Sequence, residues 1–160
     1  MPGVFAMTLI QELMKQASKG GLLNIASFNR FSPTEIRETI QTLVITEQMD
    51  LANALGDAGM SLYPSSEDML AINGLLAMMR REWSTSVEYL QELMDLQGNN
   101  TQAFTYVMMV RALRCNLDPA RAMHVVRQGL AAFPEQLELV AEKLALEDYA
   151  DLVGESSQIQ

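Results

Sequence analysis

Residues that could act as nucleophiles, general bases or metal ligands are scarce in this sequence. His124 is its only histidine and Cys115 its only cysteine. A zinc site needs three or four ligands, and no second histidine or cysteine exists to help complete one. Arg111 and Arg114 could favour the thiolate of Cys115, but nucleophilic catalysis also needs an activating base and an orienting group. We therefore expect a structural or surface histidine and a thiol without a catalytic role.

Carboxylates are numerous, but their spacing is not typical of an active site. Several gather among leucines near the C-terminus, at Glu135, Glu138, Glu142, Glu147 and Asp148. This mixture indicates the solvated face of an amphipathic helix. Nothing places two of them in a cleft, as glycoside hydrolysis requires. The segment 19–21, Lys-Gly-Gly, lacks the spacing of a phosphate-binding loop. The sequence thus predicts a protein that is not an enzyme and that uses no metal or cofactor.

The charge of the chain narrows the choice of partner. Its 160 residues include 11 Lys and Arg against 20 Asp and Glu, which gives a net charge of −9. Such a field repels nucleic-acid phosphates and anionic lipid headgroups. No apolar stretch approaches the roughly 20 residues that span a bilayer, and no basic residue precedes the apolar run at the N-terminus. We expect a cytoplasmic protein that binds another protein.

A repeat of thirty-four residues organises the chain. Two apolar columns recur at this spacing, and they contain Ile36, Leu70 and Phe104, then Ile40, Gly74 and Met108. Small residues follow in the second half of each repeat, at Ala52 and Ser86, with Ala122 two residues late. We place the two extra residues in the segment 115–119, which contains an Asn-Leu-Asp-Pro loop.

Helix-start signals divide each repeat into two helices. Ser32-Pro33 and Asp118-Pro119 each supply a capping side chain followed by a proline that is compatible with the first helical turn. The predicted first helices lie near 33–47, 67–81 and 101–115, and the second helices near 49–63, 83–97 and 119–133. An N-terminal helix over 4–19, a capping helix over 136–153 and a flexible tail over 154–160 complete the prediction. The expected fold is all-α, with repeats over 33–64, 67–98 and 101–134 in a single domain of residues 1–153.

The pattern over 33–134 resembles the tetratricopeptide repeat family. Each repeat has a small residue, then Gly or Leu seven positions later, and two repeats end at a turn proline, Pro64 or Pro134. The resemblance implies helix-turn-helix pairs stacked into a solenoid. Two residues depart from the family pattern. Trp83 opens a second helix, and Arg111 stands where an apolar or aromatic residue is commoner.

A narrower resemblance rests on the segment 74–90, which reads GLLAMMRREWSTSVEYL. It is similar to the central segment of small type III secretion proteins of the Hrp type and of the needle-subunit chaperone branch. That resemblance implies a cytoplasmic chaperone that keeps a secreted needle or translocator subunit soluble until export. A small co-chaperone and a homodimer are further partners that it leaves open.

The first helix of each repeat is expected to line a concave, largely apolar groove that binds a helix or extended segment of the client. Helical phase assigns ten residues to this groove, which are Arg37, Gln41, Val44, Ala71, Leu75, Met78, Thr105, Tyr106, Met109 and Ala112. Flexible methionines suit a surface that binds varied apolar segments, although core packing explains many of the twelve methionines equally well. The alternative function is a scaffold or self-associating module without a secreted client.

Overall fold

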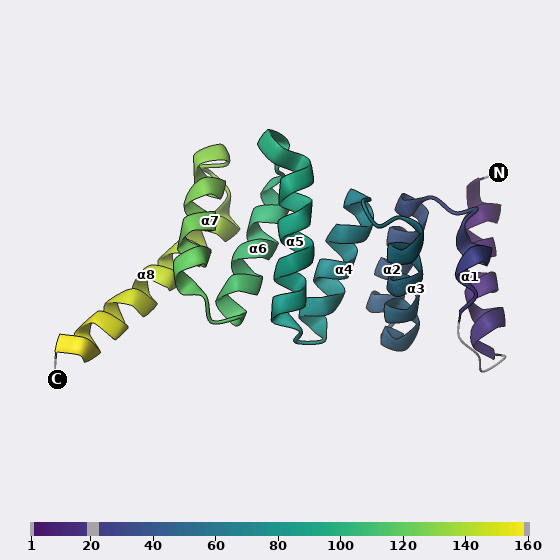
Figure 1. Ribbon diagram of the computed structural model, residues 1–160, viewed down its shortest axis with the longest axis horizontal. Helices are drawn as coiled ribbons and strands as arrows, with labels where there is room; N and C mark the ends of the chain where they lie inside the picture. Colours follow the sequence, from purple (N-terminus) through teal and green to yellow (C-terminus); the bar gives the residue numbers. More distant parts are fainter. Residues whose placement is uncertain (1, 19–22, 159–160) are drawn as a thin grey trace. The chain divides into compact units, whose positions relative to one another are not determined.

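The computed structural model describes residues 2–18 and 23–158, and the side chains of 9–18 and 23–152. These ranges contain eight α-helices, two 3-10 turns and no β-strand (Figure 1). The helices are α1 (Pro2–Ser18), α2 (Pro33–Ile45), α3 (Met49–Leu62), α4 (Glu67–Met79), α5 (Trp83–Gln97), α6 (Ala103–Cys115), α7 (Pro119–Ala132) and α8 (Leu137–Gln158). The 3-10 turns are η1 (Ile25–Phe28) and η2 (Gly98–Asn100). The predicted all-α helix-turn-helix repeat fold is confirmed.

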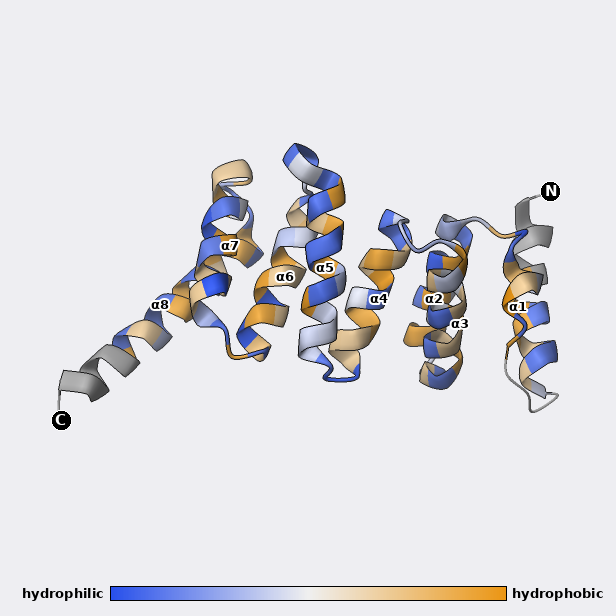
Figure 2. Cartoon of the chain, in the orientation of Figure 1, coloured by the Kyte–Doolittle hydropathy of each residue, from blue (hydrophilic) through white to orange (hydrophobic). Residues whose placement is uncertain are grey.

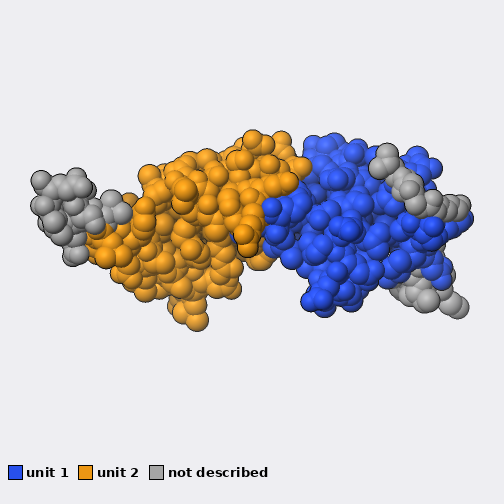
Figure 3. Space-filling view, turned by 90° about the horizontal axis from the view of Figure 1, so that it is seen from below, with its two compact units in different colours: residues 1–80 blue, residues 81–160 orange. Residues whose placement is uncertain are grey.

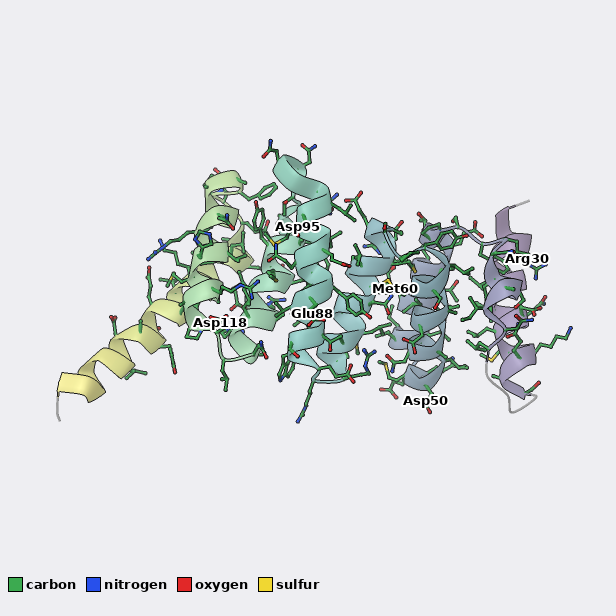
Figure 4. All side chains as sticks on the ribbon, viewed as in Figure 1. Arg30, Asp50, Met60, Glu88, Asp95 and Asp118 are labelled. Atoms are coloured by element: carbon green, nitrogen blue, oxygen red, sulfur yellow. The ribbon has the colours of Figure 1, made fainter. Side chains whose placement is uncertain are left out.

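The helices begin where side chains can satisfy their free N–H groups. The Ser32 hydroxyl accepts a hydrogen bond from the Glu35 backbone N–H at 3.1 Å, and the Glu35 carboxylate accepts one from the Ser32 N–H at 3.4 Å. This reciprocal pair fixes the start of α2. The Asp118 carboxylate accepts from the Arg121 N–H at 3.3 Å and caps α7, at the position labelled in Figure 4. The two predicted cap-and-proline starts are therefore confirmed.

The three connections between the first and second helix of each repeat share one backbone conformation. Glu47, Arg81 and Leu117 all have a positive φ, of 60°, 61° and 58°. Each lies two residues before its second helix, so the same tight turn occurs three times. In the third copy, the Asp118 N–H donates to the Leu113 carbonyl at 2.9 Å and the Leu117 N–H to the Arg114 carbonyl at 3.1 Å. A left-handed residue of this kind ends many helices, and glycine usually supplies it.

Replacing Leu117 with glycine should stabilise the protein, because glycine adopts a positive φ without a Cβ penalty. The left-handed conformation costs a non-glycine residue about 1 kcal/mol, and the Leu117 side chain is 88 % exposed, so its removal forfeits little packing. Thermal unfolding followed by circular dichroism should show a rise of about 3 °C. A lower melting temperature would mean that the flexibility of glycine in the unfolded chain outweighs the relief of strain.

The chain forms two compact units, residues 1–80 and 81–160, which Figure 3 colours separately. The single domain over 1–153 stays a prediction, and each unit has its own helix packing. Unit 1 contains α1 to α4 and η1. Its core joins leucines of α1 to the helix pair α2–α3 and to α4, which is apolar along most of its length (Figure 2). The N-terminal helix thus caps the first pair, with Leu9 and Leu13 buried.

Close approach of helices inside unit 1 depends on small residues. Ala52 is fully buried in α3, as the repeat predicts. A Cβ on Gly59 would lie 2.5 Å from the Met69 sulfur, so α3 can approach α4 only where a side chain is missing. Tyr63 then anchors the turn that follows α3, because its hydroxyl donates to the Phe31 carbonyl at 2.6 Å. This bond ties the end of α3 to the segment that precedes α2.

Unit 2 contains α5 to α8 and η2 and repeats this design. Ser86 and Ala122 are fully buried in its two second helices. A Cβ on Gly129 would lie 2.9 Å from a methyl of Leu139 and 3.0 Å from the Cβ of Tyr106. The Tyr106 ring also meets Phe133 edge to face, with 6.3 Å between the ring centroids. Gly129 and Phe133 therefore play the roles that Gly59 and Tyr63 play in unit 1.

The two extra residues of the repeat do not lie between 115 and 119, as the sequence analysis places them. The loops 46–48, 80–82 and 116–118 have the same three-residue length. Instead, α5 begins 20 residues before α6, whereas α3 begins 18 before α4 and α7 begins 18 before α8. The excess lies at the end of α5 and in the turn η2, where Gly98 has a φ of 54°. The first helix of the third repeat is therefore thirty-six residues from that of the second.

The C-terminal boundary also differs from the prediction. The sequence predicts a flexible tail over 154–160, but α8 continues to Gln158. Gly154 disfavours a helix by only about 1 kcal/mol, which does not by itself end one. The N-terminal helix ends at Ser18, and its predicted last residue, Lys19, lies outside the described residues.

Candidate protein-binding surface

The first helices of unit 1, α2 and α4, run parallel and side by side. Both Thr34 and Arg37, near the start of α2, bind Asp68 near the start of α4. The Arg37 guanidinium donates to one Asp68 oxygen at 2.8 Å, and the Thr34 hydroxyl donates to the other at 3.0 Å. The two helices contact each other within unit 1 and contain thirteen residues each, so both end on the same side of the unit.

Apolar side chains are exposed where α2 and α4 end. Ile45 is 80 % exposed and Met79 is 46 % exposed. Beside them Val44, Leu75 and Met78 are partly exposed, and Val44 and Leu75 pack against the core of unit 1 with their inner atoms. We define the α2–α4 patch as Val44, Ile45, Leu75, Met78 and Met79. The patch offers apolar contact area, and two of its side chains, Val44 and Leu75, are held in place by their packing against the core.

Helical phase explains why these residues share one face. Leu75, Met78 and Met79 are spaced i, i+3 and i+4, which places them together on one side of α4. Gln41, Val44 and Ile45 occupy the same places in α2, thirty-four residues earlier. Gln41 is exposed and borders the patch, and Ala71 is half-buried one turn before Leu75. Six of the ten predicted groove residues thus lie on the parallel helices of unit 1.

Arg37 does not leave a free positive charge on this surface, because Asp68 pairs with it. The two side chains are 36 % and 28 % exposed. An ion pair at this exposure contributes about 0 to 1 kcal/mol, so its main effect is to fix the relative position of α2 and α4. This pair lies at the N-terminal ends of α2 and α4, whereas the patch lies at their C-terminal ends, where Glu47 follows Ile45 and Arg80 and Arg81 follow Met79.

The predicted groove residues of the third repeat are placed differently from those of unit 1. Thr105, Met109 and Ala112 are buried, with exposures of 2 % or less. Their assignment assumed a thirty-four-residue step, whereas the observed step is thirty-six. Two residues turn an α-helix by about 200°, so these side chains face inward. Inside unit 2, α6 packs against α5, α7 and α8, which leaves only a narrow strip of it exposed.

The exposed strip of α6 has Phe104 near its start, 53 % exposed, but carries charge along its second half, where the equivalent part of α4 is apolar. In the corrected register, Arg111 and Arg114 occupy the places of Leu75 and Met78. Arg111 donates to Glu142 and Glu138 of α8, at 3.1 Å each, and Arg114 donates to Glu142 at 2.9 Å. Glu142 is 7 % exposed, so its carboxylate is a buried charge compensated by two guanidinium groups. This cluster holds α8 against α6.

Tyr106, the tenth predicted groove residue, belongs to the core register of α6. It occupies the place of Ile36 and Leu70, is half-buried, and contacts Phe133. Its ring therefore packs the turn after α7. Of the predicted groove, the structure brings together the residues of α2 and α4 on one surface and places those of α6 inside unit 2.

The remaining residues considered for chemistry lie apart from one another. His124 is exposed on α7, Cys115 is half-exposed at the end of α6, and Trp83 is half-buried at the start of α5. Among the described residues, no group of three or more His, Cys, Asp or Glu side chains could hold a metal ion. In the same part of the chain, no helix combines the length and the apolar character needed to cross a bilayer.

Unit 2 also has a shallow hollow of about 490 Å³ between α5 and α7. Glu88 and Asp95, both labelled in Figure 4, line it together with Tyr89. Arg121 donates to the Gln91 side chain across it at 3.1 Å, so the two walls are already linked by their own side chains. The α2–α4 patch is the better candidate for binding an apolar segment.

Comparisons with known proteins address the fold. A solved structure described as an assembly chaperone of RpL4 (Acl4, residues 1–338) matches this chain with a TM-score of 0.62. The chain shares its fold with this assembly chaperone. The match covers 96 % of this chain and 60 % of that one, at 13 % sequence identity, which supports the fold alone. No model of a known family matches the sequence. No curated protein matches it either.

Sequence reasoning missed the two most exposed members of the patch, Ile45 and Met79. The signal was present, because both residues follow a predicted groove position by four residues and they lie thirty-four residues apart. Each also ends its helix, where the following turn leaves the side chain uncovered.

Proposed function

We propose that the protein is a chaperone or adaptor that binds an apolar segment of another protein on the α2–α4 patch. The observation that carries this proposal is the exposure of Ile45 and Met79 beside Val44, Leu75 and Met78. Exposed apolar side chains gathered on one surface commonly mark a binding site. Two of the five are methionines, whose flexible thioethers adapt to varied partners.

The form of the patch favours a helical client segment. The parallel ends of α2 and α4 present apolar side chains in two rows, into which an amphipathic helix can place residues spaced i, i+3 and i+4. The fold likeness to an assembly chaperone is compatible with a role in binding another protein.

The more specific proposal is a chaperone of a type III secretion system. It rests on the resemblance of the segment 74–90 and on the acidic composition of the chain. Its client would be a secreted needle or translocator subunit, held in the cytoplasm until export, with a small co-chaperone or a second copy as further partners. Leu75, Met78 and Met79 lie both in that segment and in the patch.

A binding role is also favoured over catalysis by the state of the charged groups. The most buried carboxylate, Glu142, is paired with Arg111 and Arg114, and Asp68 is paired with Arg37. Groups paired in this way hold helices together. We therefore propose that the protein is not an enzyme.

The proposal is tested by replacing Ile45 and Met79 together with glutamate. Two charges at the patch should weaken client binding about tenfold or more, because apolar contact is exchanged for desolvation of carboxylates. The client is first identified by co-expressing the full chain with the small subunits encoded beside it and recovering the complex by affinity purification. The affinity of the parent and of the variant for the purified client is then measured by isothermal titration calorimetry. Circular dichroism of the variant should match the parent, since both side chains are exposed.

The matched control is Leu96→Glu, which adds the same charge at a 53 % exposed leucine of α5 outside the patch. It should leave client affinity unchanged. Equal affinity of the patch variant and the parent would refute the patch as the binding site. Recovery of the chain alone, as an oligomer in sedimentation, would favour the self-associating scaffold instead.

A further inference from the structure

A second surface, on α8, has the pattern of a first repeat helix whose outer side is not covered by any helix of the described residues. The helix α8 begins thirty-four residues after α6, the same step that separates α4 from α2. It packs against α6 and α7 within unit 2, with Leu139 and Leu146 buried. In sequence position and in packing, α8 is the first helix of a fourth repeat.

The register shows which side of α8 is uncovered. Val140 occupies the place of Ile36, and Leu144 occupies the place of Ile40 and Val110. Ile36, Ile40 and Val110 are all 0 % exposed. Val140 and Leu144 are 36 % and 55 % exposed, and Leu137, on the same side, is 80 % exposed. Hydrophobic residues therefore continue along the described part of α8 (Figure 2).

A helix that ends a repeat array usually has a polar outer face. The outer face of α8 is instead apolar in its first half, and its second half carries two aspartates beside Leu152, which is 64 % exposed. Asp148 and Asp151 follow Leu144 by four and seven residues, which places them in line with it on the same side. Both are exposed, and the one basic residue in the α8 sequence, Lys143, pairs with Glu147 at 3.8 Å.

The charge of this face discriminates between occupants. In antiparallel packing, a second copy of α8 would set its Val140 and Leu137 against Asp148 and Asp151, and these carboxylates would lose water without gaining a basic partner. A helix from another protein with an apolar seam and Lys or Arg at one end would satisfy both halves of the face. The helices of a repeat pair run antiparallel, so the basic end would be the N-terminal end of the partner helix.

We propose that the outer face of α8 binds a basic amphipathic helix of another protein, which completes a fourth helix pair. Val140 and Leu144 provide the apolar contact, and Asp148 and Asp151 provide the charge that selects the partner. This surface lies in unit 2 and is independent of the α2–α4 patch.

Two segments of the chain itself supply matched probes. The α7 sequence, 119–132, and the α3 sequence, 49–62, are both second helices of fourteen residues. The first contains two arginines, Arg121 and Arg127, and the second contains two aspartates, Asp50 and Asp57. Fluorescently labelled synthetic peptides of each are titrated with the full-length protein, and binding is read from fluorescence anisotropy at low and moderate salt.

The α7 peptide should bind about tenfold more tightly than the α3 peptide at low salt, and the difference should shrink as salt screens the charges. Leu144→Glu should remove this binding, whereas the variant carrying Ile45→Glu and Met79→Glu should keep it. The second result separates this proposal from the proposed function, which depends on the patch.

Equal binding of the two peptides, or equal binding by the parent and Leu144→Glu, would overturn the proposal. So would the absence of any peptide binding. A concentration-dependent dimer of the parent that Leu144→Glu abolishes would also overturn it, because the face would then be occupied by a second copy.

Discussion

Replacing Met109 with glutamate is expected to unfold unit 2. Met109 is 0 % exposed on α6, a helix packed on three sides within that unit. A carboxylate at this place loses its water and gains no basic partner, and the methionine packing is lost as well. The expected cost is about 4 kcal/mol or more, which is at the severe end of single substitutions.

The matched control for this substitution is Met79→Glu, the same exchange at a 46 % exposed methionine. It should change the free energy of unfolding by no more than about 0.5 kcal/mol. Thermal and urea unfolding followed by circular dichroism compare the two variants with the parent. Similar stabilities for Met109→Glu and Met79→Glu would contradict the burial of Met109. They would favour a step of thirty-four residues from α4 to α6, in which Met109 faces outward.

Gly129→Leu should be the next most disruptive change, because the helix α7 has no room for a side chain at this point. The first carbon alone would lie 3.0 Å from the Cβ of Tyr106, an atom fixed close to the backbone of α6. Relief would require α7 to move away from α6 and α8. Overpacking of this kind costs about 3 kcal/mol, or roughly 10 °C in the melting temperature of a chain of this size.

The control for the glycine substitution is Ala131→Leu, two residues later on α7, where the side chain is exposed. Its melting temperature should stay close to that of the parent. An unchanged melting temperature for Gly129→Leu would mean that α6 and α7 can separate at low cost, so that the small residues of the repeat are not needed for close packing.

The helices themselves could be predicted from the sequence because their start signals are local. The Ser32 capping box and the Asp118 cap each act within one helical turn, and the recurrence repeats the helix boundaries along the chain. The observed helices begin within two residues of the predicted starts for all three pairs. The tail could not be predicted in the same way, because its polar residues are compatible with both helix and coil.

The phase of α6 was not predictable from hydrophobicity alone. Residues Val107 to Val110 are all buried, so this helix is apolar nearly all round and its pattern fits a step of thirty-four or thirty-six residues. The decisive signal was Arg111. With a step of thirty-four residues from α4 to α6, it falls at a position that is usually apolar or aromatic in the family pattern. In the longer step it lies on the exposed strip, where Glu138 and Glu142 bind it.

The candidate site was predictable where the phase was right. Val44, Leu75 and Met78 lie on one surface of unit 1 as their helical spacing predicts, because the step from α2 to α4 is thirty-four residues. The same reasoning failed for Thr105, Met109 and Ala112, since an error of two residues reverses the face of a helix.

Cys115 gives the chain a natural attachment point for spectroscopy. It is the only cysteine in the sequence, its side chain is half-exposed, and it ends the helix whose exposed strip binds α8. A spin label or fluorophore coupled to this thiol would sit one residue from Arg114 and would sense any loosening of its bond to Glu142. The attachment of α8 can therefore be followed in solution without introducing a new residue.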